Sequence, residues 1–201
     1  MSYYKRRSGT RRYKRRYLLV CEGSVTEPAY FNQLKGLYQE SIINITCLAE
    51  KKSAPDYLIK RAEAAQADLR KGDELWIVLD VDRWTPDHFA RLEKWAKNDT
   101  CRNVAVSNPC FEIWLVFHDK DPGESNKKAC QAYYNEYIAH GTKSLRSNWL
   151  TSDRVKAAVT RAKSRDSNQD SIIPVNRTSR VYKFIENIEE FCTKYKSVTK
   201  S

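Results

Sequence analysis

Hydrophobic residues fall along the chain in two patterns, short continuous runs and longer stretches with helical spacing. Short runs rich in β-branched and aromatic residues predict buried strands. The predicted strands are Tyr17–Cys21, Ile42–Leu48, Glu74–Asp82 and Asn103–Ser107. Between them, apolar residues three or four positions apart predict the helices Glu27–Gln39, Asp56–Arg70 and Pro86–Asn98. Strands that alternate with helices predict an α/β fold with a doubly wound, mainly parallel sheet.

Capping residues predict where these helices begin and end. Thr26 is expected to cap the first helix, whose first turn contains Glu27 and Pro28. Thr85 is expected to cap the third helix in the same way. Gly72 is expected to stop the second helix, because glycine adopts the backbone conformation that ends many helices.

The pattern changes in the second half of the chain. Phe111–His118 is apolar on nearly every side, and its length suits either a strand or a helix; the preceding Asn-Pro favours a helix. After a polar loop, the remaining candidate helices are Ala129–His140, Thr151–Arg165 and Ser179–Tyr195. We therefore divide the chain into a basic flexible arm (1–16), an α/β core (17–118) and a helical extension packed on the core (119–201).

Positive charge is concentrated at the N-terminus. The net charge is +11, and residues 1–16 contain eight Lys and Arg and no acid. Such a segment can bind phosphates and release counterions, and its tyrosines can stack on bases. We expect the arm to bind nucleic acid; a solvated tail and, less so, a membrane-surface contact are the alternatives. The residues expected to contact nucleic acid are Arg6, Arg7, Arg11, Arg12, Lys14, Arg15, Arg16 and Arg83, with Lys143 as an additional cation.

Two of the predicted strands end in acidic residues. Glu22 follows the first strand, and Asp80 and Asp82 close the third. In an open α/β sheet, functional groups gather beyond the carboxyl ends of the strands, so we expect these carboxylates to lie side by side. Asp80 and Asp82 point to the same face because alternate strand residues do so. Carboxylates suit Mg²⁺ or Mn²⁺, with Glu27 as a further ligand; the alternative is that the two aspartates form a solvated strand end.

Several other classes of protein are excluded by what the sequence lacks. It has no GxxxxGK[ST], no GxGxxG after a strand and no GxSxG, which argues against a P-loop ATPase, a dinucleotide site and a serine hydrolase. It has no apolar run long enough to span a membrane or to form a signal peptide, so we expect a cytoplasmic protein. The six cysteines have no zinc-site spacing and are expected to be free, and His118 is expected to be a packed residue rather than a base.

Three segments of the chain resemble the RloB family, which is linked to prokaryotic defence loci and related to the Toprim fold. They are CEGSVTEPAYF at Cys21–Phe31, LDVD at Leu79–Asp82 and SNPCFEIWLVFH at Ser107–His118. A weaker match, IPVNRTSRVYKFIENI at Ile173–Ile188, departs from the family at Val175–Thr178, where proline is expected.

The resemblance implies a Toprim-like core and a metal site. In Toprim proteins, a glutamate after the first strand and a DxD after a later strand bind Mg²⁺, and here those roles fall on Glu22, Asp80 and Asp82. Related nucleases often carry an acid four positions after the glutamate, whereas this chain has threonine there and the acid one position later, at Glu27. Glu112 is another candidate ligand; alternatively it only caps its helix. The resemblance also implies an ABC-type ATPase partner.

We therefore expect a Mg²⁺-dependent nuclease that cleaves DNA or RNA, with tRNA among the candidates, in anti-phage defence. Asp80 and Asp82 are expected to hold the metal, and Glu22 to share it or to accept a proton from the attacking water. The alternative is a non-catalytic subunit that binds nucleic acid or a partner within a defence complex. The sequence leaves the oligomeric state open, a homo-oligomer included.

Overall fold

The computed structural model describes residues 14–38, 42–49, 54–81, 84–124, 126–138, 144–146 and 148–198. The strands are β1 Arg15–Cys21, β2 Ile43–Ala49, β3 Glu74–Asp80, β4 Arg102–Asn108 and β5 Thr178–Ser179. The helices are α1 Thr26–Lys35, α2 Pro55–Gln66, α3 Pro86–Lys97, α4 Glu112–Phe117, α5 Lys127–Tyr137, α6 Ser152–Arg165 and α7 Val181–Val198.

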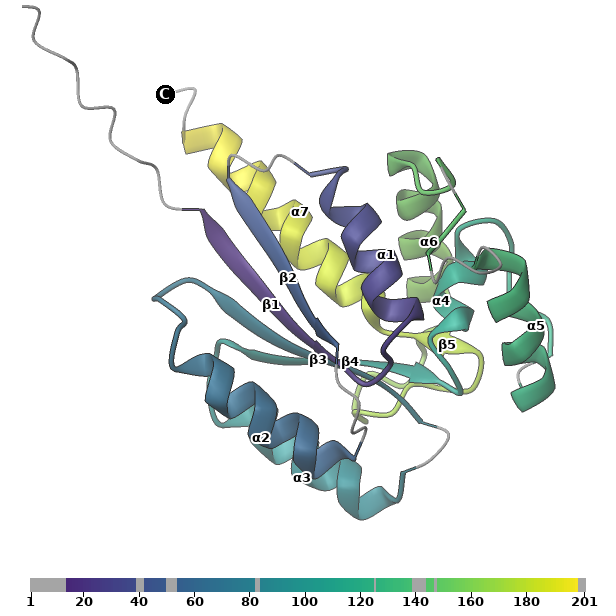
Figure 1. Ribbon diagram of the computed structural model, residues 1–201, viewed down its shortest axis with the longest axis horizontal. Helices are drawn as coiled ribbons and strands as arrows, with labels where there is room; N and C mark the ends of the chain where they lie inside the picture. The colour runs from purple at the N-terminus through teal and green to yellow at the C-terminus, as the bar shows by residue number, and fades with distance from the viewer. Residues whose placement is uncertain are drawn as a thin grey trace, which may run out of the picture.

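The strands form one sheet in the order β2-β1-β3-β4-β5 (Figure 1). β1 pairs in parallel with both β2 and β3, β3 pairs in parallel with β4, and the short β5 runs antiparallel to β4. The predicted α/β fold with a mainly parallel sheet is confirmed, and the segment Phe111–His118 contains a helix, as its Asn-Pro start indicated.

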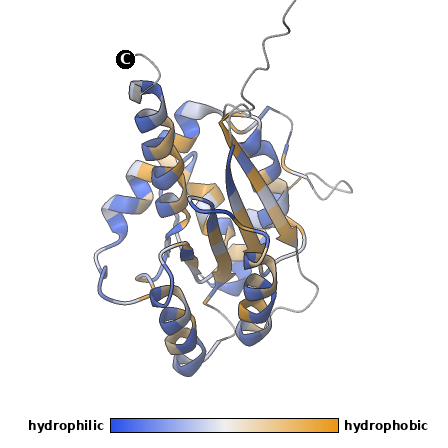
Figure 2. Cartoon of the chain, turned by 90° about the vertical axis from the view of Figure 1, so that its left-hand side faces the viewer, coloured by the Kyte–Doolittle hydropathy of each residue, from blue (hydrophilic) through white to orange (hydrophobic). Residues whose placement is uncertain are grey.

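Helices cover both faces of the sheet, and a separate apolar core lies on each face (Figures 1 and 2). Along β1, Leu19 faces the core that α1, α4, α6 and α7 share, whereas Val20 faces the core under α2 and α3. This alternation follows from the period of two in strand side chains. Residues on both faces of β1 and β3 are buried, which explains why these strands appear in the sequence as continuous apolar runs.

The C-terminal part of the chain joins the same sheet. The helix predicted at Ser179–Tyr195 begins at Val181, because Thr178 and Ser179 pair with the end of β4 instead. Phe184 of α7 packs against the rings of Tyr17 and Trp76, at centroid distances of 5.7 and 5.2 Å. α7 therefore packs directly on the sheet.

A buried ion pair fixes the segment that leads from α6 to β5. Arg180 is almost fully buried and donates to both carboxylate oxygens of Asp166, at 2.8 and 2.9 Å. The hydroxyl of Tyr182 donates to the same carboxylate at 2.8 Å. The guanidinium also contacts the backbone carbonyls of Asn168 and Ser171, so one side chain anchors both ends of this turn.

Two of the predicted helix caps are wrong. Thr26 is the first residue of α1 rather than its cap, which is Val25, because the Thr26 hydroxyl is used in a distant contact described below. α2 ends at Gln66, well before Gly72, which lies in the turn before β3 with φ of 94°. Thr85 is confirmed as the cap of α3; its backbone N–H donates to Nδ1 of His88 at 3.3 Å.

Candidate functional site

The ends of β1 and β3 meet where the strand order of the sheet reverses. β1 lies between β2 and β3 in the sheet. After β1 the chain forms β2 on one side of β1, and it then crosses to form β3 on the other side. Ligands in open α/β sheets bind in the crevice beyond the strand ends at this point. Glu22 follows β1 directly, and its N–H donates to Val78 of β3 at 2.9 Å. The prediction that Glu22 and Asp80 lie side by side is confirmed.

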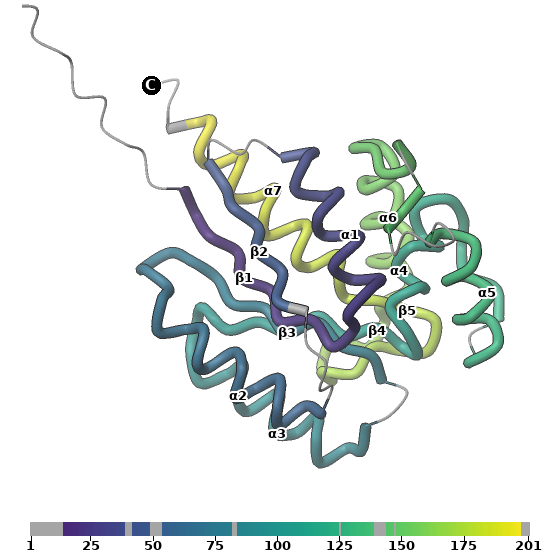
Figure 3. The backbone as a smooth tube through the Cα atoms, viewed as in Figure 1, coloured from purple at the N-terminus to yellow at the C-terminus, as the bar shows by residue number. Residues whose placement is uncertain are grey.

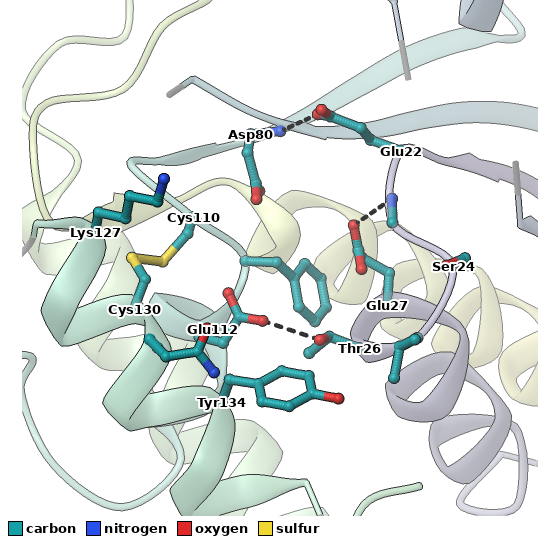
Figure 4. Close-up of a pocket in the computed structure, with 14 residues that line it drawn as sticks. Glu22, Ser24, Thr26, Glu27, Asp80, Cys110, Glu112, Lys127, Cys130 and Tyr134 are labelled. Atoms are coloured by element: carbon teal, nitrogen blue, oxygen red, sulfur yellow. Dashed lines mark hydrogen bonds between the residues drawn. A yellow bond between two sulfur atoms is a disulfide. The ribbon is translucent and has the colours of Figure 1, made fainter. Parts of the chain in front are cut away.

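A direct hydrogen bond joins these two strand ends. Oε2 of Glu22 accepts the backbone N–H of Asp80 at 3.0 Å and Nε1–H of Trp84 at 3.3 Å. Glu22 is almost fully buried. Its carboxylate therefore binds the backbone of the β3 end, and the side chain of Asp80 points into the space beside it (Figure 4).

A cleft of about 320 Å³ opens at this place, between the β1–α1 turn, the start of α4 and one face of α5 (Figure 4). Its acidic lining residues are Glu22, Glu27, Asp80 and Glu112. Its other lining residues are Gly23, Ser24, Val25, Thr26, Cys110, Phe111, Lys127, Cys130, Gln131 and Tyr134. The two acids that sequence reasoning gave as additional ligands, Glu27 and Glu112, both line the same cleft as Glu22 and Asp80.

Glu27 is buried in the first turn of α1 and is held by the turn before it. Its Oε1 accepts the backbone N–H of Gly23 at 2.8 Å. A Cβ atom on residue 23 would overlap the Glu27 carboxylate, so the close approach requires glycine. The pKa of Glu27 is raised from 4.5 to about 7, chiefly by burial and further by the carboxylates of Glu112 and Glu22, against the opposing effect of the Gly23 N–H.

Glu112 reaches the cleft from the first position of α4. One of its oxygens accepts the hydroxyl of Thr26 at 2.9 Å, a contact between residues 86 positions apart. The cap of α4 is Phe111 rather than Glu112. Of the two roles left open by the sequence, the structure thus places Glu112 in the cleft, and the Thr26 contact joins the starts of α1 and α4.

The donor atoms of the cleft suit a hard divalent cation. Asp80, Glu27 and Glu112 all present carboxylate oxygens, which Mg²⁺ and Mn²⁺ prefer. Burial is the main cause of the raised pKa of Glu27, and the neighbouring carboxylates of Glu112 and Glu22 add negative charge that a cation would offset. Within the ranges that the structure describes, no three acidic, histidine or cysteine side chains are placed so that together they could hold a metal ion. Asp82, the remaining predicted ligand, lies outside those ranges.

Of the predicted nucleic-acid contacts, only three lie in the described part of the chain. Lys14 is exposed, and Arg15 and Arg16 begin β1, at the end of the strand opposite Glu22. Arg15 is paired with Glu74, and Nε of Arg16 lies 2.8 Å from Oδ2 of Asp73. A contact between these arginines and nucleic acid stays a prediction. The residues outside the described ranges are Arg6, Arg7, Arg11, Arg12, Arg83 and Lys143.

The cation that does line the cleft is Lys127, which the sequence did not single out. It is the first residue of α5, two positions before Ala129, where the sequence predicts that this helix begins. Asn126 caps α5 by accepting the N–H of Ala129 at 2.9 Å, and this Asn is the signal that would have placed the start correctly.

The expectation that all six cysteines are free is wrong. Cys110 and Cys130 form a disulfide that lines the cleft (Figure 4). The two residues are 20 positions apart and follow no sequence motif, so only the folded arrangement of β4, α4 and α5 brings them together.

His118 is a packed residue, as expected. Its ring lies between Tyr30, Trp114 and Trp149, with Nε2 3.2 Å from the Tyr30 hydroxyl and Nδ1 2.9 Å from the Trp114 carbonyl. Burial lowers the pKa of His118 from 6.5 to about 4, so the ring is neutral near pH 7.

Comparison with known proteins identifies a family. A family model described as RloB-like protein matches residues 17–188, which is most of the chain. No curated protein and no solved structure matches the sequence. No helix in the described segments has the length and apolar character needed to cross a bilayer.

Proposed function

This chain belongs to the RloB-like family, and from that premise and the geometry of the cleft we propose that it is a divalent-metal-dependent nuclease. The observation that carries the proposal is the meeting of Glu22 and Asp80 at the switch point of the sheet, with Glu27 and Glu112 lining the same cleft. Four carboxylates in one cleft repel one another unless protons or cations compensate them. A substrate that arrives with Mg²⁺ or Mn²⁺ supplies that compensation, and phosphodiesters are such substrates.

The side chains of the cleft fall into three roles in this proposal. Asp80 and Glu112 would offer oxygen ligands, together with Asp82. Glu22 accepts the backbone N–H of Asp80, and so fixes the backbone position from which the Asp80 side chain extends. Glu22 and Glu27 are the carboxylates that can accept a proton from the attacking water. The bound metal would polarise the scissile phosphate and stabilise the leaving oxygen.

The wider biological role is part of the same proposal. The core would be a Toprim-like domain of a cytoplasmic protein, with DNA or RNA, including tRNA, as substrate. The protein would act in anti-phage defence with an ABC-type ATPase partner. In that complex the chain would be a monomer or a homo-oligomer. The arm 1–16 would increase affinity for nucleic acid by releasing counterions, chiefly through the six cations that precede Arg15, because Arg15 and Arg16 pair with Glu74 and Asp73 in the sheet.

Cleavage assays on the purified chain test the nuclease. Single-stranded DNA, duplex DNA, RNA and tRNA are incubated with Mg²⁺, with Mn²⁺ and with EDTA. We expect Asp80→Asn and EDTA each to reduce cleavage by roughly a hundredfold or more. Asp87→Asn is the matched control, because Asp87 is an exposed aspartate on α3 outside the cleft. Cleavage that survives both Asp80→Asn and EDTA would contradict the proposal.

If the chain needs its partner, the test moves to cells. Co-expression with the proposed ABC-type ATPase partner should be toxic, and Glu22→Ala should relieve the toxicity. Toxicity that Glu22→Ala and Asp80→Asn leave unchanged would assign the effect to another part of the complex.

A non-catalytic binding subunit is the second candidate function. It is favoured by the lack of a complete metal cage among the described residues. It predicts salt-sensitive binding of nucleic acid that is lost when residues 1–14, which precede β1, are deleted, with no dependence on Mg²⁺ and no cleavage products.

A further inference from the structure

One face of α5 forms a wall of the cleft opposite the carboxylates. Lys127, Cys130, Gln131 and Tyr134 all line the cleft. Their spacing of three, one and three positions places them on one side of the helix. Lys128 belongs to the same turn but does not line the cleft. The cleft therefore has an acidic wall from β1, β3, α1 and α4, and a polar wall with one cation from α5.

Lys127 is available to a ligand. Its side chain is exposed, and within the described ranges it takes part in no ion pair. Figure 4 shows it extending from α5 along the cleft toward the side where Asp80 lies. A cation facing carboxylates across an open space, without pairing with any of them, suits a group that carries negative charge between the two walls. A phosphodiester has this property, since its non-bridging oxygens can face a metal on one side and an ammonium group on the other.

The position of α5 depends on few buried groups. α5 lies at the outside of the molecule next to α4 (Figures 1 and 3). Tyr137 is its one buried residue, at the end far from Lys127. Near Lys127, the strongest connection is the disulfide from Cys130 to Cys110, which precedes Glu112 by two positions. The disulfide thus links the wall that carries Lys127 to the wall that carries Glu112.

We propose that this face of α5 is the phosphate-binding wall of the cleft, that Lys127 contacts the substrate phosphate, and that the Cys110–Cys130 disulfide holds the wall opposite the carboxylates. The inference rests on the proposed function, because it assigns the ligand of the same cleft to phosphodiesters. It adds Lys127 as a residue that binds the substrate, and the disulfide as a covalent bond that controls the position of the α5 wall.

The disulfide makes the wall sensitive to thiol reductants. A dithiol transfers two electrons to the Cys110–Cys130 bond: one thiolate attacks a sulfur and breaks the S–S bond, and the second thiolate resolves the mixed disulfide. The products are two cysteine thiols and the oxidised dithiol. The other described cysteines, Cys21, Cys47, Cys101 and Cys192, are already free, so this bond is the target of the reductant.

Binding of a labelled oligonucleotide tests the role of Lys127. Fluorescein-labelled single-stranded DNA and RNA are titrated with protein in Ca²⁺, at several salt concentrations, and anisotropy is measured. We expect Lys127→Gln to weaken binding about tenfold. The slope of the logarithm of the binding constant against the logarithm of the salt concentration should become shallower by about the amount that one phosphate contact contributes. Lys127→Arg should keep most of the affinity. Lys128→Gln, which removes the same charge one residue away, should change neither quantity.

Equal effects of Lys127→Gln and Lys128→Gln would overturn the assignment of Lys127. Together with the cleavage assay, the titration also separates the two proposals. If Asp80→Asn abolishes cleavage while Lys127→Gln leaves binding and cleavage unchanged, the nuclease stands and the inference falls. If Lys127→Gln weakens binding while the wild-type protein shows no Mg²⁺-dependent cleavage, and Glu22→Ala and Asp80→Asn leave the toxicity in cells unchanged, the inference stands and the nuclease falls.

Dithiothreitol tests the disulfide. Reduced wild-type protein should bind the oligonucleotide several-fold more weakly than oxidised protein, and α5 should exchange its amide hydrogens faster. The double variant Cys110→Ser/Cys130→Ser should bind like the reduced protein and should not respond to dithiothreitol. Equal binding by oxidised and reduced wild-type protein, with thiol titration confirming reduction, would overturn the role of the disulfide.

Discussion

Glu22 accepts a hydrogen bond from the backbone N–H of Asp80 at 3.0 Å, although the two residues are 58 positions apart. The contact exists because β1 and β3 are parallel neighbours, and Cys21, the last residue of β1, pairs with Val78, two residues before β3 ends at Asp80. It converts two acidic strand ends into one unit, in which Glu22 holds the backbone and Asp80 presents its side chain to the cleft. The proposed metal chemistry depends on this unit.

Gly23→Ala should disable the cleft without unfolding the protein. The new Cβ would displace the Glu27 carboxylate from its 2.8 Å bond to the N–H of residue 23. We expect metal-dependent cleavage to fall on the order of tenfold to a hundredfold, as for other small displacements of site groups. The free energy of unfolding should fall by about 1–3 kcal/mol, because the buried Glu27 carboxylate must move and loses its hydrogen bond.

Gly123→Ala is the matched control for that variant, since a Cβ there would meet the Tyr133 hydroxyl at an ordinary 3.8 Å. Kinetics and urea denaturation of both variants give the answer. A Gly23→Ala protein that is as active as Gly123→Ala would show that the position of Glu27 does not matter.

Because of His118, the free energy of unfolding should fall as the solution becomes acidic. Its pKa is lowered to about 4 by burial, whereas the unfolded chain has 6.5. Between these two pH values the unfolded state binds a proton on His118 and the folded state does not. The contribution of His118 to the free energy of unfolding is therefore complete above pH 6.5 and is lost as the pH falls to about 4. The difference corresponds to about 3 kcal/mol. Urea denaturation at several pH values measures it.

His118→Gln supplies the comparison for the acid experiment. Glutamine can hydrogen bond to the hydroxyl of Tyr30 but does not titrate. The variant should lose less stability than wild type between pH 7 and pH 4. Parallel stability curves for the two proteins would assign the acid sensitivity to other groups.

Arg180→Ala should destabilise the protein strongly, because it leaves the Asp166 carboxylate buried without its cation. The expected loss is about 3–5 kcal/mol in the free energy of unfolding. Lys97→Ala removes the cation of an exposed pair with Glu93 on α3 and should cost less than about 1 kcal/mol. Chemical denaturation of both variants tests the prediction; similar losses would mean that the Asp166–Arg180 pair contributes no more than a surface pair.

The sequence was sufficient for the four parallel strands of the sheet and for the acids of the cleft. Continuous apolar runs such as Glu74–Asp80 are long enough only for strands, and their alternation with helices forces a mainly parallel sheet. A parallel sheet brings the ends of its strands to one edge. The proximity of Glu22 and Asp80 was therefore predictable once the two strands were recognised, provided that they were neighbours.

The parts that the sequence did not predict depend on long-range contacts. The Thr26 hydroxyl does not cap its own helix because Glu112 lies within reach in the folded protein. The Cys110–Cys130 disulfide and the place of Lys127 both depend on where α5 packs, and α5 has too few apolar residues for its pattern to specify that. The short strand β5 and the start of α7 at Val181 likewise depend on the pairing of Thr178 and Ser179 with β4.

Mn²⁺ binding by the wild-type protein and by Asp80→Asn tests the central claim most directly. Calorimetric titration needs neither substrate nor partner, so it examines the acidic cleft alone. We predict saturable binding by wild type, binding at least about tenfold weaker in Asp80→Asn, and wild-type affinity in the control Asp87→Asn. Equal Mn²⁺ affinity in all three proteins, or no binding by wild type, would contradict the assignment of the cleft as a metal site.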